Sequence, residues 1–427
     1  MQKCKRGVIW KRSVAVYVAQ GLTNVYQLEE SLGNGTYKID KYAEFEIHEP
    51  KHREILSTRI KDRVFQRSLC DNVVYPQITR SFIHDNGACQ IGKGVDFALD
   101  RLDCLLHRYF RHYGKEGHAL KCDVKGYFQN TRHDVAKKAV SKRVTDREAA
   151  IRVHEIIESY GAKYWRMMLE EYGIDTATAK KAAQIITDTR TRMVGAQLLE
   201  PERKKAAFRK GWETLAKTVA ALPGLKAETR EEIRQRVFTE SARGIGLGSQ
   251  ASQLVELAVL DDLDHFIKEK LRIKYYIRYM DDFLLLHPDK EYLKYCKAEI
   301  EKKLAEIGLT LNEKTEMYPI KQGIMFLKWH FHLTATGKVI RKMNKKSIVK
   351  ERRKLKKLKA MLEEGKITIQ DVEANFQSWT ANAKRGNTRN LLLEMKAYYF
   401  ELFGEVYRNG RYENGETADQ GTGAGKQ

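Results

Sequence analysis

Residues 276–286 have the sequence Tyr276-Ile277-Arg278-Tyr279-Met280-Asp281-Asp282-Phe283-Leu284-Leu285-Leu286. Two apolar runs flank two acids, a pattern that predicts a β-hairpin with Asp281 and Asp282 at its turn. An Asp-Asp pair is usually no more than a turn or a solvated face, and we expect the latter of Asp261-Asp262, which lies in a helical pattern. Residues 281–282 differ, because burying two acids between apolar strands is costly unless a cation is bound.

A third acid, Asp123, ends the short apolar run 119–123, which predicts a strand. Adjacent strands of one sheet would bring Asp123 close to Asp281 and Asp282. Phosphoryl transfer from a nucleoside triphosphate uses two divalent ions about 3.5–4 Å apart, and Mg²⁺ prefers carboxylate oxygens. The three acids therefore predict a site for two Mg²⁺ ions, for which Mn²⁺ can substitute.

The charge of the whole chain predicts a polyanionic partner. Its 427 residues include 78 Lys and Arg against 56 Asp and Glu, a formal net charge of +22. Nucleic acid is the commonest polyanion bound by such proteins, and the alternative is a basic protein that is merely soluble.

The cysteines and the apolar runs bear on the compartment. The cysteines form no CxxC pair, which argues against a zinc site or a disulfide framework: Cys4, Cys70, Cys89, Cys104, Cys122 and Cys296. No run approaches the ~20 apolar residues of a membrane helix, and the basic N-terminus does not fit a signal peptide. We expect a cytoplasmic protein without a membrane partner.

The periodicity of the remaining chain predicts many helices and a few strands. Residues 59–67 indicate a basic loop, and alternation at 42–47 indicates a strand. Helices are expected at 96–113, 133–240, 254–271 and 290–307, strands at 317–333, and further helices after the basic stretch 341–359.

Several short motifs occur along the chain in an order that a known family shares. Tyr279-Met280-Asp281-Asp282 resembles the YxDD motif of reverse transcriptases. Upstream, residues 50–55 and 61–66 resemble the fingers motif of that family, and residues 123–128 resemble its first palm motif. Downstream, residues 308–315 resemble the fourth palm motif, and residues 323–327 resemble the hairpin that grips the primer. The resemblance covers roughly residues 40–335.

This resemblance implies an α+β fold of the right-hand polymerase type, with fingers, a palm with an antiparallel sheet, and a helical thumb. The implied regions are an N-terminal extension and fingers at 1–118, the palm at 119–335 with a helical insert at about 140–240, the thumb at 336–408, and a disordered tail at 409–427.

The resemblance also implies roles at the acids. Asp123 and Asp281 would bind the metals directly, and Asp282 would support the cluster. Lys314 would donate a proton to the pyrophosphate, unless it is an ordinary exposed lysine. Phe128 would be the steric gate against a ribose 2′-hydroxyl, unless it is a core aromatic beside Tyr127.

Further residues are implied to contact the nucleotide. Lys61 and Arg63 would grip the triphosphate, with a solvated basic loop as the alternative. In residues 243–253, Leu247 and Gln253 replace the glutamine and proline of a motif common in the family. This variant resembles reverse transcriptases of diversity-generating retroelements and related bacterial phage-defence lineages. Lys93 would substitute for an arginine that group II intron enzymes carry.

Each of two segments could have either a structural role or a binding role. The helical insert is either a buttress or a platform that docks RNA or protein. The basic stretch 341–359 is either a solvated face or a surface that contacts the backbone of a nucleic-acid duplex, through Lys345, Lys346, Lys350, Arg352 and Arg353.

The expected activity is RNA-directed DNA synthesis from dNTPs with Mg²⁺, in a bacterial retroelement or anti-phage system. The expected partners are an RNA template, in particular a dedicated non-coding RNA, the DNA product, and an accessory protein or a second copy of the chain. The alternatives are an RNA-dependent RNA polymerase, which the aromatic Phe128 disfavours, and a catalytically modest RNA-binding scaffold.

Overall fold

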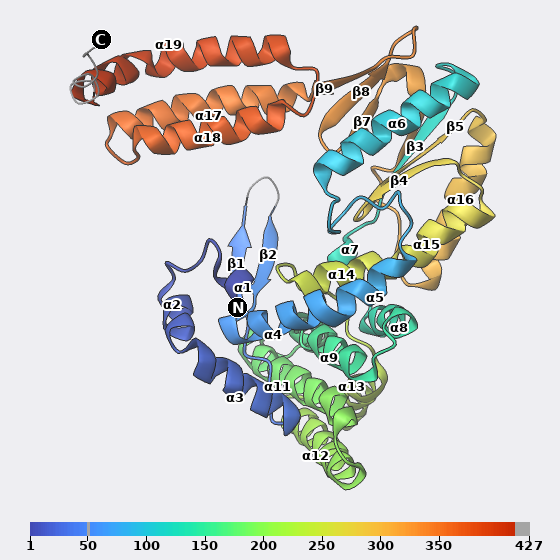
Figure 1. Cartoon of the computed structure of the whole chain (residues 1–427). Coiled ribbons are helices and arrows are strands. Elements are labelled where there is room, and N and C mark those ends of the chain that lie inside the picture. Colours follow the sequence, from blue (N-terminus) through green and yellow to red (C-terminus); the bar gives the residue numbers. More distant parts are fainter. Residues whose placement is uncertain (49–51, 415–427) are drawn as a thin grey trace, which may run out of the picture. The chain divides into compact units, whose positions relative to one another are not determined.

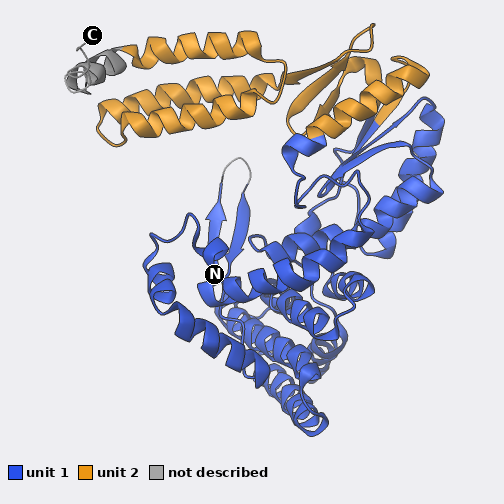
Figure 2. Ribbon diagram, viewed as in Figure 1, with its two compact units in different colours: residues 1–98, 120–317 blue, residues 99–119, 318–427 orange. Residues whose placement is uncertain are grey.

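The computed structural model describes residues 1–48 and 52–414 (Figure 1). The chain divides into two compact units (Figure 2). Unit 1 consists of Met1–Ala98 and Leu120–Met317, and unit 2 of Leu99–Ala119 and the chain from Tyr318 onward. These units group segments by contact, so the division at 118 and 335 implied by the resemblance stays a prediction.

Unit 1 begins with three helices and a hairpin. These elements are α1 (Gln2–Lys5), α2 (Arg12–Ala19), α3 (Gly21–Gly33) and the antiparallel strands β1 (Ala43–Ile47) and β2 (Arg53–Ser57). The strand expected at 42–47 is confirmed as β1. Of the fingers motif at 50–55, residues 50 and 51 lie outside the described residues.

The expected basic loop at 59–67 is wrong, because this segment forms the helix α4 (Ile60–Leu69). Its apolar residues Val64 and Phe65 are buried against Leu28 and Tyr37. Ile60 and Leu69 pack against the same cluster, each four residues from Val64 or Phe65, and this helical spacing outweighs the basic residues of the segment. The chain continues through a π-helical turn (Cys70–Val74) and α5 (Tyr75–Ile78).

The expected helical insert is confirmed as a stack of helices: α8 (His133–Arg143), α9 (Arg147–Glu158), α10 (Ala162–Glu171), α11 (Thr176–Gly195), α12 (Pro201–Ala220) and α13 (Ala227–Thr239). Helices α10–α13 share a core around Trp165, Ile186 and Leu215. Asp175 caps α11, since its Oδ1 accepts hydrogen bonds from the backbone N–H of Ala177 and Thr178 at 3.1 and 3.0 Å.

A four-stranded sheet lies in the middle of the chain. Its strands are β3 (His118–Asp123), β4 (Tyr275–Tyr279), β5 (Asp282–His287) and β6 (Glu316–Pro319), in the order β4-β5-β3-β6. The helices that follow or precede these strands are α7 (Tyr127–Asn130), α14 (Gln250–Val259), α15 (Asp261–His265) with a π-helical turn (Phe266–Lys270), and α16 (Lys290–Glu306). The predicted strand at 119–123 and helix at 290–307 are confirmed.

Unit 2 contains most of α6 (Val95–Tyr113), a three-stranded antiparallel sheet and three long helices. The strands are β7 (Ile324–Phe326), β8 (Trp329–Leu333) and β9 (Val339–Met343), and the helices α17 (Lys345–Glu363), α18 (Ile369–Ala383) and α19 (Arg389–Asn414). Arg341 joins these parts, because its guanidinium pairs with Asp100 at 2.8 Å and donates to the Arg385 carbonyl at 2.9 Å.

Two sequence-based expectations concern this unit, the hairpin at 323–327 and the tail from 409. The predicted hairpin at 323–327 is confirmed as β7–β8. The helix α19 runs to Asn414, past the start of the predicted tail at 409, and residues 415–427 lie outside the described part.

The α+β class with antiparallel sheets is confirmed. The right-hand arrangement of fingers, palm and thumb stays a prediction. Among the described helices, none combines the length and apolarity needed to cross a membrane.

Candidate metal and nucleotide site

The three predicted acids converge at one end of two adjacent strands. Asp123 is the last residue of β3, Asp282 is the first of β5, and Asp281 lies in the turn before it. The backbone N–H of Val124 donates to the Asp281 carbonyl at 3.2 Å, which ties the turn to the end of β3. The predicted hairpin with acids at its turn is therefore confirmed.

The turn itself is tight. Tyr279 pairs with Asp282, so only Met280 and Asp281 connect β4 to β5. Met280 has a φ of +57°, in the left-handed region that a residue with a side chain rarely adopts. Two-residue hairpin turns require such angles, and here the turn brings Asp281 and Asp282 to the end of the sheet where β3 ends with Asp123.

The acids repel one another in a partly buried setting. Burial, together with the charges of Asp123 and Asp281, raises the pKa of Asp282 to about 7, against the opposing effect of Lys121. The Oδ1 atom of Asp282 is buried and has no hydrogen-bond partner among the described residues. A buried carboxylate oxygen with neighbouring acids and no donor fits a divalent cation that prefers oxygen ligands, as Mg²⁺ does.

Asn312 completes the site and was not singled out from the sequence. Its Nδ2 donates to Asp123 Oδ2 at 2.9 Å, and its backbone N–H donates to the Asp123 carbonyl at 2.7 Å. Asn312 Oδ1 accepts from the backbone N–H of Lys314 at 3.1 Å. The predicted proton donor Lys314 therefore lies in the loop that orients Asp123, and its side chain is exposed.

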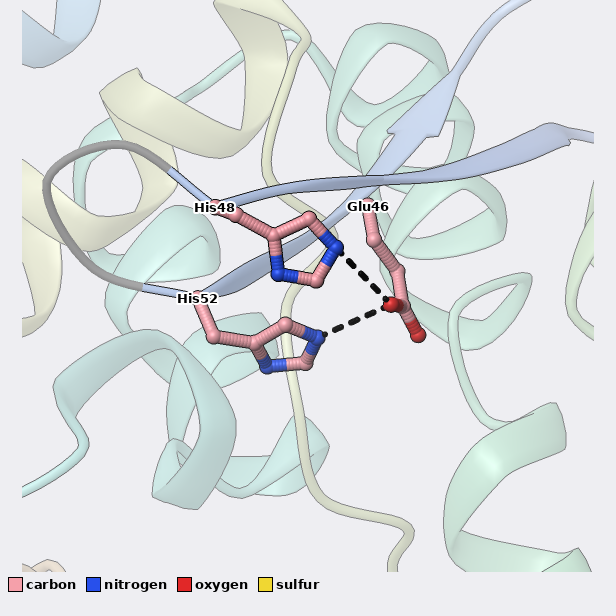
Figure 3. A group of neighbouring side chains, drawn as sticks. All are labelled: Glu46, His48 and His52. Atoms are coloured by element: carbon pink, nitrogen blue, oxygen red, sulfur yellow. Dashed lines mark ion pairs between the residues drawn. The ribbon is translucent and has the colours of Figure 1, made fainter.

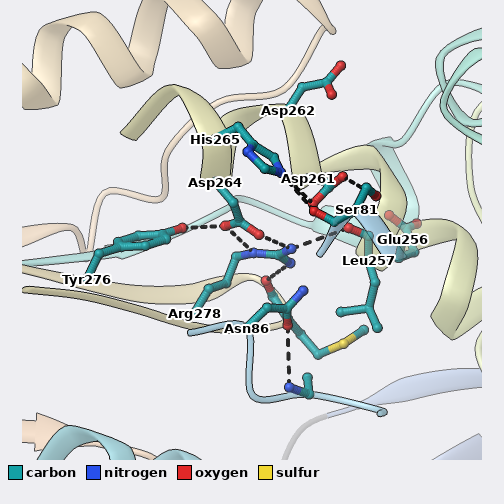
Figure 4. A network of polar contacts seen from close by, with 12 residues as sticks. Ser81, Asn86, Glu256, Leu257, Asp261, Asp262, Asp264, His265, Tyr276 and Arg278 are labelled. Atoms are coloured by element: carbon teal, nitrogen blue, oxygen red, sulfur yellow. Dashed lines mark hydrogen bonds and ion pairs between the residues drawn. The ribbon is translucent and has the colours of Figure 1, made fainter. Parts of the chain in front are cut away.

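A buried ion pair between β4 and α15 supports the turn (Figure 4). Arg278 on β4 and Asp264 on α15 are both fully buried, and they join at 2.7 Å (Nε to Oδ1) and 2.6 Å (Nη2 to Oδ2). Arg278 Nη1 also donates to the Met280 carbonyl at 3.0 Å, and Tyr276 donates its hydroxyl to Asp264 at 2.6 Å. This network fixes the carbonyl that precedes Asp281.

The expectation of a solvated face at Asp261-Asp262 is wrong for Asp261. Its side chain is fully buried and accepts hydrogen bonds from Ser81 Oγ at 2.7 Å and Arg143 Nε at 2.8 Å. Asp262 remains partly exposed and pairs with Lys142 at 2.7 Å. Burial of Asp261 is possible because Arg143 compensates its charge.

Glu256 on α14 is a further buried acid, and its charge interacts with that of Asp281. It is fully buried, and its Oε2 accepts a hydrogen bond from Thr131 Oγ1 at 3.0 Å. Burial, with a contribution from the charge of Asp281, raises the pKa of Glu256 from 4.5 to about 8. The folded chain thus holds this proton more tightly than the unfolded chain.

Glu256→Gln is expected to flatten the pH dependence of stability. In the native chain the free energy of unfolding should fall as pH rises from about 4.5 to about 8, because the unfolded chain loses the Glu256 proton in this range while the folded chain keeps it. The slope from one group is at most about 1.4 kcal/mol per pH unit. Urea unfolding across this pH range, compared between native and variant chains, measures the difference, and parallel curves would contradict the assignment.

Phe128 and Leu247 line one cavity of about 2330 Å³ within unit 1. Phe128 lies on α7 with its ring half-buried and edge-on to Tyr127, the centroids being 5.8 Å apart. Its carbonyl accepts from the N–H of Ile245 at 2.7 Å, and the Leu247 carbonyl accepts from the N–H of Leu56 at 3.1 Å. These bonds bring α7, the 245–247 segment and β2 to the same cavity.

The remaining predicted nucleotide residues have other neighbours. Lys61 pairs with Asp40 at 2.8 Å, and Arg63 donates to the Thr58 carbonyl at 3.2 Å. Lys93 donates to the carbonyls of His84 and Asn86 at 3.0 and 2.9 Å, and Gln253 is exposed on α14. Within residues 1–48 and 52–414, none of these four lines the cavity of Phe128 and Leu247, and their nucleotide roles stay predictions.

The predicted nucleic-acid contacts share one exposed side of α17. Its inward positions are Glu351, Leu355 and Leu358, which are buried against α18 and α19. The outward positions include all five predicted residues, Lys345, Lys346, Lys350, Arg352 and Arg353. Arg352 lies 5.6 Å from the ring centroid of Tyr398 on α19. The helix thus presents a dense row of cations to solvent.

Comparison with known proteins gives no family assignment. No protein-family model and no curated protein sequence matches the chain. Among solved structures, telomerase from Candida albicans in complex with a TWJ fragment of telomeric RNA aligns with a TM-score of 0.39 and 11% identity, covering 80% of this chain and 55% of that chain.

Two structures of apo telomerase from Candida tropicalis align similarly. The form truncated from its C-terminal domain gives a TM-score of 0.38 and 10% identity, over 75% of this chain and 60% of that one. The other gives 0.38 and 11%, over 76% and 53%. This chain spans little more than half the length of these telomerases, and likeness at this level does not establish a common family.

Proposed function

We propose that this chain is an RNA-directed DNA polymerase that adds deoxynucleotides with the help of two Mg²⁺ ions. The observation that carries the proposal is the convergence of Asp123, Asp281 and Asp282 at one end of the adjacent strands β3 and β5. A buried oxygen of Asp282 there lacks a hydrogen-bond partner among the described residues. Acids in this arrangement suit phosphoryl transfer.

The chain's own residues account for the geometry that this reaction needs. Asp123 and Asp281 would hold the ions, which when bound neutralise phosphate charge and activate a primer hydroxyl. Asn312 orients the Asp123 carboxylate, and Arg278 fixes the Met280 carbonyl ahead of Asp281. The loop position of Lys314 suits proton donation to a leaving pyrophosphate.

Charge supports a nucleic-acid template. The net charge of +22 and the exposed cations of α17 favour contact with a phosphate backbone. The resemblance of residues 243–253 to retroelement and phage-defence enzymes supports a bacterial cytoplasmic setting, with a dedicated non-coding RNA as template. The insert α8–α13 offers a surface for that RNA or for an accessory protein.

The decisive experiment is primer extension by the purified chain on an RNA template with Mg²⁺. DNA synthesis from dNTPs supports the proposal. Synthesis from rNTPs alone would identify an RNA-directed RNA polymerase, and RNA binding without synthesis would identify a scaffold.

Phe128→Ala is expected to admit ribonucleotides. The ring lies on the wall of the cavity that Leu247 also lines, and there it would exclude a 2′-hydroxyl. Removal of the ring should lower the preference for dNTP over rNTP by about tenfold or more, as loss of a steric contact worth 1–3 kcal/mol predicts. The preference is measured as the ratio of kcat/KM values for single insertions.

Tyr127→Phe is the matched control, because Tyr127 is the neighbouring aromatic residue and its side chain is buried in the core. It should leave the sugar preference unchanged. An unchanged preference in Phe128→Ala, together with a lower melting temperature, would instead make Phe128 a core residue.

A further inference from the structure

The β1–β2 hairpin places an acid and two histidines on one face. In its antiparallel register Glu46 lies opposite Glu54 and Ile47 opposite Arg53, so the next pair outward is His48 and His52. Side chains two residues apart share a face of a strand. Glu46 and His48 therefore project together, and His52 joins them from across the hairpin (Figure 3).

The ligand atoms of these three side chains already lie close together. Glu46 Oε2 is 3.5 Å from His48 Nε2 and 3.2 Å from His52 Nε2, and all three ligand atoms lie within 4.8 Å of one another. Bonds of about 2.0–2.1 Å to a tetrahedral Zn²⁺ separate ligand atoms by about 3.3 Å. The carboxylate therefore sits at ligand spacing from both imidazoles, and a small side-chain rotation would complete the set.

Another acid of the hairpin, Glu54, is engaged elsewhere. Glu54, which faces Glu46 across the hairpin, pairs with Lys163 on α10 at 2.6 Å. Glu46 instead forms its ion pairs with His48 and His52. This division leaves one carboxylate for the histidines and fastens the hairpin to the insert through the other.

We propose that Glu46, His48 and His52 form a binding site for a transition-metal ion of the Zn²⁺ class. Imidazole nitrogen with one carboxylate is a donor set that Zn²⁺ accepts and Mg²⁺ does not favour. The side chains are 72%, 53% and 54% exposed for His48, His52 and Glu46, so water completes the coordination. The site is separate in chemistry from the all-carboxylate cluster of Asp123, Asp281 and Asp282.

A bound ion would join β1 to β2 where the hairpin turns, and the other end of the hairpin reaches the cavity of Phe128 and Leu247. The N–H of Leu56 on β2 donates to the Leu247 carbonyl at 3.1 Å, and Leu56 and Glu46 both line that cavity. Cross-linking β1 to β2 at His48 and His52 therefore restrains a wall that contacts Leu247. The role of the ion is to hold the hairpin, not to react.

The test is Zn²⁺ binding by the untagged full-length chain, stripped of metal and then kept in excess Mg²⁺. Zn²⁺ is titrated in competition with a chromophoric chelator, and Co²⁺ absorption reports the ligand geometry. We expect the native chain to bind one more equivalent of Zn²⁺ than the double variant His48→Asn/His52→Asn. Glu46→Gln, which keeps both imidazoles, should weaken binding and alter the Co²⁺ spectrum.

His330→Asn/His332→Asn is the matched control. These histidines lie two residues apart on β8 with ring nitrogens 2.6 Å from each other, but among the described residues no acid or cysteine completes a metal-ligand cluster with them. The control should retain the equivalent that the hairpin variant loses. Equal Zn²⁺ binding by the native chain and the folded hairpin variant, as judged by an unchanged melting temperature, would overturn the proposal.

Discussion

Replacing both Asp281 and Asp282 with alanine should abolish DNA synthesis while the chain stays folded. Asp281 lies in the β4–β5 turn and Asp282 begins β5, so the change removes one expected ligand of the ions and the acid that supports the cluster. Loss of metal-based charge stabilisation worth several kcal/mol predicts a rate lower by about a thousandfold or more. Single-nucleotide insertion on an RNA template with Mg²⁺ measures this directly.

Stability separates a metal site from a structural role. Without metal, the double variant should be at least as stable as the native chain, because it removes the repulsion that helps to raise the pKa of Asp282 to about 7 and also removes its unpartnered buried oxygen. Mg²⁺ should raise the melting temperature of the native chain only. Undiminished synthesis in the double variant would refute the site.

Glu29→Ala/Glu30→Ala provides the matched control. These two consecutive acids are exposed on α3, outside the insert, and their replacement removes the same charge from the chain. Its synthesis should remain close to that of the native chain, which excludes a general effect of net charge on RNA binding.

Local patterns explain why the core of the site could be predicted from sequence. The residues from Ile277 to Leu286 are mostly apolar on both sides of the two acids, with little alternation of polar and apolar side chains. The hairpin is therefore formed by residues that are close together in the sequence, and a local pattern can predict it. Asp123 ends an apolar strand in the same way. Both features appear in the structure where the sequence placed them.

Long-range contacts explain what the sequence could not supply. Asp261 is buried because Arg143, 118 residues away, pairs with it. Asn312 reaches Asp123 across 189 residues. Neither contact leaves a local pattern, although the charged Arg278 inside an apolar strand was a visible signal of a buried partner. The predicted basic loop was wrong because charge was weighed above the four-residue spacing of Ile60 with Val64 and of Phe65 with Leu69.

The largest loss of stability is expected from Asp264→Ala. Arg278 would be left fully buried without its carboxylate partner, and breaking such a pair costs about 3–5 kcal/mol. Urea unfolding measures the change. The control is Asp134→Ala, which breaks the exposed pair of Asp134 with Arg132 and should cost no more than about 1 kcal/mol.

A combined variant then distinguishes stability from positioning. Arg278→Met with Asp264→Leu and Tyr276→Phe replaces the whole network by apolar groups, so no charge or hydroxyl is left buried and unpaired. Such replacements are often neutral or stabilising, and most of the lost stability should return. Synthesis should not return, because the Met280 carbonyl loses the Nη1 donor at 3.0 Å and the turn that carries Asp281 is no longer fixed. Misplacement of about 1 Å at a reacting centre lowers rates by roughly a hundredfold. If synthesis recovered together with stability, Arg278 would act through folding alone.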